Sequence, residues 1–114
     1  MNDEFIRRIY NTVVKEHIDI YKDLYNNTII NEKTTDFWKK AIKFYHELDD
    51  NNKDIFFEIM KVVIIDTVSE VFGIFDGSST LQGGNLDIGI TIDGKDTENE
   101  LQDSFLEYVE NVED

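Results

Sequence analysis

The chain of 114 residues carries 25 Asp and Glu residues against 11 Lys and Arg residues, a formal net charge of −14. It contains no Cys and no Pro, and 40% of its residues are hydrophobic, which argues against a disordered acidic tail. The length fits one domain, so we expect residues 1–114 to form a single compact unit. The absence of Cys excludes disulfides, thiol catalysis and Cys-based metal sites. The deficit of Lys and Arg disfavours direct binding to nucleic-acid phosphates.

The first half of the chain predicts two amphipathic helices. Apolar residues recur at helical spacing over about 3–25. A second helix is expected over about 35–48, because Thr35 is a favoured N-cap residue and a wide apolar face follows it. Its aromatic residues, Trp38 included, are typical of a hydrophobic core. The Asp and Asn residues at 49–52 indicate a turn after it.

A third helix is expected over about 53–75, and it is apolar around almost its whole circumference. Neighbouring elements bury such a helix on most sides, so we predict that it forms the centre of the fold. Four charged residues interrupt its apolar run from Ile55 to Phe75, which is too many for a membrane span, and Asp76-Gly77 ends the helix. The acidic start at residues 1–4 is unlike a signal peptide. We therefore expect a cytoplasmic protein that does not enter the membrane.

The pattern changes after residue 76. Apolar and polar residues alternate over 86–92, which is the period of a half-buried strand, and residues 79–81 are its expected partner. Thr97 and Glu100 fit a capping box that begins a last helix over about 98–112. The predicted fold class is α+β and mostly α. It has about four helices packed around a central buried helix (about 53–75), with one small β-hairpin (about 79–92).

Few residues indicate enzyme chemistry. The two histidines, His17 and His46, are expected to be surface or half-buried side chains, and no phosphate-binding loop or nucleophile motif is present. Asp66 and Glu70 lie one helical turn apart and are the candidate ligands for a divalent metal or a small molecule, together with the Gly-rich hairpin. A solvated polar stripe explains them more simply. We therefore expect a non-enzymatic protein with no catalytic residue and no cofactor.

The negative charge is local. Residues 1–48 hold eight basic and eight acidic residues, whereas residues 76–114 hold one Lys against eleven acids. The last predicted helix contains like-charged residues three or four apart, each pair costing a few tenths of a kcal/mol (roughly 0.2–0.5). Local stability does not favour such a pattern. The candidate partner-binding residues in this region are Asp96, Glu98, Glu100, Asp103, Glu107 and Glu110.

Two interpretations of this charge stay open. The acids serve solubility and pair within the chain, with Lys39, Lys40 and Lys43 lying opposite them. Alternatively, the acidic face attracts a protein partner that presents a basic surface, because a concentrated charge steers association.

The last forty residues resemble small uncharacterised acidic bacterial proteins, some of which act as immunity or anti-defence inhibitors. The resemblance lies in Asp93-Gly94 and in Leu101-Gln102-Asp103-Ser104-Phe105-Leu106-Glu107, which follow Asp76-Gly77-Ser78-Ser79. It implies no catalytic residue.

The leading hypothesis is therefore a non-enzymatic acidic protein-binding domain, such as an immunity protein or an inhibitor of a bacterial or phage effector. The alternative is a small-molecule or metal-binding domain, or a minor enzyme, that uses Asp66 and Glu70. A homodimer formed through apolar surface on the first or second helix is the third possibility.

Overall fold

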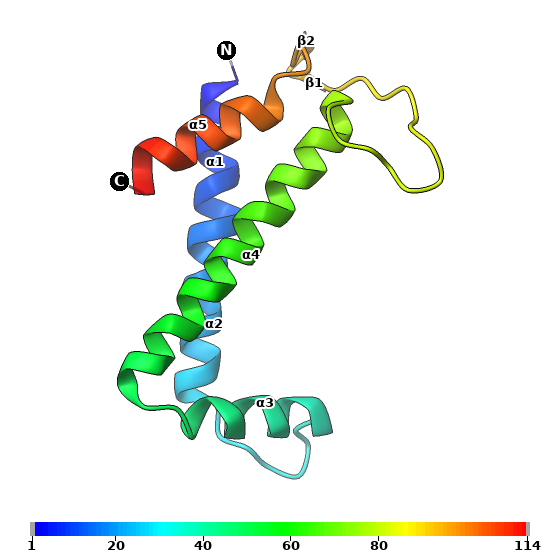
Figure 1. Ribbon diagram of the computed structural model, residues 1–114. Helices are drawn as coiled ribbons and strands as arrows, with labels where there is room; N and C mark the ends of the chain where they lie inside the picture. The colour runs from blue at the N-terminus through cyan, green and yellow to red at the C-terminus, as the bar shows by residue number, and fades with distance from the viewer. Residues whose placement is uncertain (1, 114) are drawn as a thin grey trace.

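The N-terminal helix forms a rod along most of the molecule and contains a widened turn. In the computed structural model, which describes residues 2–113, α1 (Asp3–Ile9), the π-helical segment η1 (Tyr10–Lys15) and α2 (Glu16–Asn27) follow one another without a break (Figure 1). At the end of η1, Glu16 donates its N–H to the carbonyl of Asn11, five residues back, where an α-helix uses four. The expected helix over about 3–25 is confirmed.

The next two helices begin and end at residues suited to capping. α3 (Asp36–His46) follows Thr35, whose extended backbone fits the N-cap position although its side chain makes no capping hydrogen bond. α4 (Asp50–Asp76) begins three residues earlier than predicted, because the Asp49 side chain accepts the N–H of Asn52 at 2.8 Å. It ends at Gly77, whose φ of 82° is left-handed, as predicted.

The hairpin forms further along the chain than predicted. β1 (Thr91–Ile92) pairs antiparallel with β2 (Lys95–Asp96), so the expected hairpin over about 79–92, with residues 79–81 as the partner strand, is wrong in its position. Asp93 and Gly94 both have positive φ and form the tight turn that favours Asp-Gly. Within residues 77–90 the structure contains no strand, and this segment extends beyond the end of α4 (Figure 1).

The last helix, α5 (Leu101–Glu113), begins later than predicted. The expected capping box is wrong, because Thr97 is buried and its backbone makes tertiary contacts. Its N–H donates to the carbonyl of Ile90 at 3.1 Å, and its carbonyl accepts from the Asn2 side chain at 3.1 Å. Glu98 and Asn99 then take positive φ values, which delays the helix.

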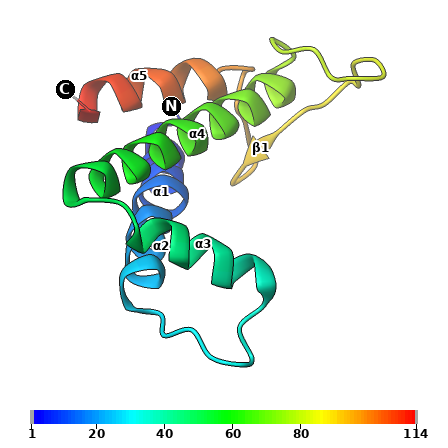
Figure 2. The same ribbon diagram turned by 60° about the horizontal axis from the view of Figure 1, so that its bottom comes forward.

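Two separate hydrophobic clusters lie at the two ends of α4. The first cluster joins α1, η1, the C-terminal half of α4 and α5. Its buried members are Ile6, Tyr10, Val14, Phe72, Leu101 and Phe105. The second cluster joins α2, α3 and the N-terminal half of α4. Its buried members are Tyr25, Ile42, Tyr45 and Phe57. Figures 1 and 2 place α5 and α3 at opposite ends of the molecule.

The prediction that α4 is buried on most sides is wrong. Only Phe57, Ser69, Phe72 and Gly73 of its 27 residues are buried. The molecule measures 48 × 35 × 23 Å, and its radius of gyration is 17.6 Å. A compact chain of this length has a radius of gyration of about 13 Å. Too few elements surround α4 to cover it, because α3 packs at one end and α5 at the other.

The predicted fold class is nevertheless confirmed, since the chain is mostly helical with one small antiparallel hairpin. Across residues 2–113, no helix combines the length and the apolar character that crossing a bilayer requires.

Candidate functional site

α5 presents a line of carboxylates on the side that faces away from the core. Leu101 and Phe105 are fully buried in the first cluster. At 100° per residue, Asp103, Glu107 and Glu110 fall on the opposite side of the helix. All three are exposed, as the sequence predicts for a partner-binding face.

The start of α5 is fixed by hydrogen bonds from α4. The Asp76 carboxylate accepts the backbone N–H of Gln102 at 2.7 Å, which satisfies one of the free donors of the helix N-terminus. The Gln102 side chain donates to the carbonyl of Ser69 at 3.1 Å. A side chain on Gly73 would clash here, because its Cβ would overlap Ser79 Oγ. The acidic helix is therefore a rigidly held element.

The remaining candidate acids lie on the hairpin and on the turn that leads into α5. Asp96, Glu98 and Glu100 are exposed on either side of the buried Thr97. The Asp96 side chain accepts the N–H of Glu98 at 2.6 Å, which shapes this turn. The buried Thr97 holds the segment in place, so its acidic neighbours project outward from an anchored backbone.

None of the six candidate acids forms an ion pair with a cation within residues 2–113. The ion pairs there join Glu4 to Arg7 and Arg8, and Glu113 to Lys61. The expected alternative, in which Lys39, Lys40 and Lys43 lie opposite these acids, is not observed, because α3 lies at the other end of α4 (Figure 2). Basic side chains of α1 and of the hairpin lie near some of these acids without pairing with them, and Lys95 directly precedes Asp96. Arg7 and Glu107 line one shallow groove of about 380 Å³ between α1 and α5.

The alternative candidates, Asp66 and Glu70, are both exposed on α4. Within residues 2–113 no three His, Asp or Glu side chains gather closely enough to hold a metal ion. Neither residue lines any of the three grooves described in this section. The structure therefore leaves them as two neighbouring surface carboxylates.

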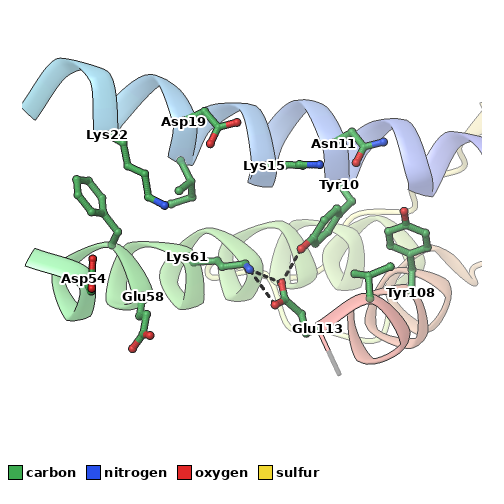
Figure 3. A pocket seen from close by; sticks show the side chains of 13 residues that line it. Tyr10, Asn11, Lys15, Asp19, Lys22, Asp54, Glu58, Lys61, Tyr108 and Glu113 are labelled. Atoms are coloured by element: carbon green, nitrogen blue, oxygen red, sulfur yellow. Dashed lines mark hydrogen bonds and ion pairs between the residues drawn. The ribbon is translucent and has the colours of Figure 1, made fainter. Parts of the chain in front are cut away.

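A larger groove, which the sequence does not predict, lies between the N-terminal rod, α4 and the end of α5 (Figure 3). Its volume is about 650 Å³. Lys15, Lys22 and Lys61 line it together with Asp19, Asp54, Glu58 and Glu113. The charges of both signs give the groove no single preference for an anion or a cation. A smaller groove of about 260 Å³ lies between α1 and the hairpin, next to Arg8 and Asp96.

Glu113, which lines the larger groove, is held by two donors from distant parts of the chain (Figure 3). The Tyr10 hydroxyl donates to one carboxylate oxygen at 2.5 Å, and Lys61 Nζ donates to the other at 2.8 Å. Lys61 first, and then Tyr10, holds the pKa of Glu113 below its ordinary value. Burial, reinforced by Glu113, raises the pKa of Tyr10 above its ordinary value of 10.

This cluster fastens the C-terminal turn of α5 to α4 and to η1. Glu113 is one of the eleven acids of residues 76–114, and unlike the six candidate acids it has a cation partner. No local pattern could have indicated it, because Tyr10 and Glu113 are 103 residues apart.

Comparisons of the chain with protein-family models, with curated proteins and with solved structures find no match.

Proposed function

We propose that this chain is a non-enzymatic protein-binding domain whose acidic face engages a basic surface on a protein partner. The acidic face consists of Asp96, Glu98, Glu100, Asp103, Glu107 and Glu110. The proposal includes the class expected from the sequence, a cytoplasmic immunity protein or inhibitor of a bacterial or phage effector. The observation that carries it is the line of three exposed carboxylates on α5 without a cation partner in the described chain.

The energetics of α5 support this proposal. Asp103 and Glu107 are four residues apart, and Glu107 and Glu110 are three apart, so their charges repel one another. Glu110 also lies near the C-terminal end of the helix, where the dipole disfavours negative charge. When a basic partner binds, it offsets both the repulsion between the carboxylates and the unfavourable position of Glu110. In the isolated chain these charges add no stability.

The rigidity of α5 also favours recognition. A surface on an anchored helix loses little conformational entropy when a partner binds. Its charges are already held in a fixed arrangement, which favours binding. Negative charge repels nucleic-acid phosphates, so a protein with a positively charged groove is the partner that this surface fits. The charge then acts mainly on the rate of association.

The test is affinity capture from the native host with three purified forms of the full chain. The first is the wild type, and the second reverses the α5 line with D103K, E107K and E110K. The third is a matched control with the same change of charge at exposed acids far from α5, namely E16K, D23K and E47K. Circular dichroism checks that each form is folded.

We expect the wild type and the control to recover the same protein with a basic surface, identified by mass spectrometry. The α5 variant should recover at least about tenfold less of it, because charge complementarity of this kind changes association rates by about 10-fold or more. Equal recovery by the α5 variant contradicts the proposal. An equal loss by both variants also contradicts it, because overall charge would then explain binding.

A further inference from the structure

The N-terminal half of α4 carries an apolar stripe that no element of the described chain covers. It consists of Ile55, Ile59, Val62 and Val63, and the last three are 57–59% exposed. These residues are spaced by three, four and seven or eight positions, so they lie on one face of the helix. Phe44 of α3 is also exposed, and its ring lies 6.2 Å from that of Phe56, beside the stripe.

Contiguous apolar surface of this kind marks an interface more often than an ordinary exposed side chain does. The same face of α4 continues into Asp66, which follows Val62 by one turn, and then into Glu70. At the other end of the stripe, Lys40 is exposed on α3, one turn before Phe44. The N-terminal end of the stripe therefore has charges of both signs nearby, Lys40 on α3 and Asp50 and Asp54 on α4, whereas its C-terminal end continues into the acids Asp66 and Glu70.

We propose that a second copy of this chain packs against the apolar stripe, with the two α4 helices antiparallel and a two-fold axis near Ile59. A two-fold interface places the same patch of both copies in contact. The antiparallel arrangement brings Asp66 and Glu70 of each copy towards Lys40 of the other. A parallel arrangement would instead place Asp66 against its own counterpart, which is unfavourable.

The distribution of charge along the chain also favours a second copy at this position. Residues 1–63 hold 10 basic and 12 acidic residues, whereas residues 64–114 hold 1 basic and 13 acidic residues. The apolar stripe therefore lies in the part of the chain with little net charge. α5 packs along the C-terminal half of α4 (Figure 1), where its last turn reaches Lys61, and its acidic face points away from the core, so the dimer leaves this face free to bind another partner.

The first test is sedimentation of the full chain over a range of concentrations. The variant replaces two exposed residues of the stripe, I59K with V62K. The matched control, I20K with I29K, replaces two other exposed isoleucines by Lys. We expect the wild type and the control to form dimers, and the stripe variant to dissociate at least about 100-fold more readily, since each 1.4 kcal/mol is a factor of ten. Thermal unfolding checks that every form is folded.

The second test determines the direction of the two helices, and it uses the fact that the chain contains no Cys. The I59C variant places its thiol near the proposed axis and should cross-link two copies on oxidation. The D66C variant places its thiol seven residues further, so the two thiols are separated by about 21 Å along antiparallel helices and should not cross-link. A monomeric wild type overturns the proposal, and so does a stripe variant that dimerises normally. Cross-linking of D66C as efficient as that of I59C overturns the antiparallel arrangement.

Discussion

The two ends of α4 differ in how they are covered, although the helix is apolar along both. At the C-terminal end, α1, η1 and α5 enclose Phe72, and the buried Phe105 ring lies 5.7 Å from it. At the N-terminal end, α2 and α3 cover Phe57 and leave Ile59 on the other side exposed. The difference shows that the apolar sequence of a long helix predicts how much surface needs to be covered. It does not predict which neighbouring elements will cover that surface.

The same two ends differ in what they present to a partner. At the C-terminal end, neighbouring helices of the same chain cover the apolar residues of α4, and α5 displays its acidic face. At the N-terminal end the apolar stripe is exposed, and the surrounding residues have little net charge. We therefore assign two kinds of interaction to one small chain. The acidic face favours association with a basic protein, and the apolar stripe favours association with a second copy.

The largest predicted effect concerns the enclosed end. Phe105→Ala removes a fully buried ring and should lower the free energy of unfolding by about 3–5 kcal/mol, measured by urea denaturation. Phe37→Ala, at a ring that is 61% exposed, is the matched control and should cost less than about 1 kcal/mol. Equal losses of unfolding free energy at the two positions would contradict the distinction between the enclosed end of α4 and the exposed surface.

The next effect tests how α4 fixes the acidic helix. Asp76→Ala should lower the free energy of unfolding by about 1 kcal/mol, because the N–H of Gln102 loses its acceptor. Asp76→Asn keeps an acceptor oxygen and should cost less. Hydrogen exchange should quicken in the first turn of α5 in the Ala variant only. Unchanged exchange there would show that Asp76 does not hold the helix.

A smaller effect should depend on pH, since Glu113 has a lowered pKa in the folded protein. A group of this kind stabilises the fold above its ordinary pKa of 4.5, and its contribution is lost as the pH falls through the folded pKa. Glu113→Gln should therefore cost about 0.5 kcal/mol at neutral pH, because the ion pair with Lys61 is partly exposed. Below pH 4.5 the difference from the wild type should shrink.

Tyr10 in the same cluster gives stability the opposite dependence on pH. Its pKa is raised by burial and by Glu113, so its contribution is complete below pH 10 and is lost as the pH rises beyond that value. The stability difference between the wild type and Tyr10→Phe should therefore shrink only in strongly alkaline solution. A difference that shrinks on acidification alone would contradict the role of the neutral hydroxyl as donor.

The smallest effect has the opposite sign. Neutralising the acidic face with E107Q and E110Q should raise the free energy of unfolding by roughly 0.5 kcal/mol, because repulsion between neighbouring carboxylates is removed. The gain should disappear at high salt, which screens these charges. Glu16→Gln on α2 is the control. A loss of stability in the double variant would indicate that these acids already have favourable partners.

The helices and the acidic face were predictable because their causes are local. Periodic apolar residues predict the N-terminal rod, and Gly77 predicts the end of α4 because a left-handed residue is needed there. The carboxylates of α5 follow from the same 3.6-residue period that places Phe105 in the core.

The features that were not predictable depend on distant contacts. Thr97 has the sequence of a helix cap, yet its contacts with Asn2 and Ile90 bury it. Alternation over 86–92 predicts a strand, but only Thr91 and Ile92 of this segment pair with another strand. Likewise, Lys61 meets Glu113 across 52 residues, so no spacing in the sequence could indicate the pair.

The measurement that tests the central claim most directly is the association rate constant for the captured partner as a function of ionic strength. For the wild type we predict fast association that slows steeply as salt is added, because the acidic face steers the encounter. For the form with D103K, E107K and E110K we predict slower association with little salt dependence. If this form associates at the rate of the wild type at every ionic strength, the acidic face of α5 is not the binding surface.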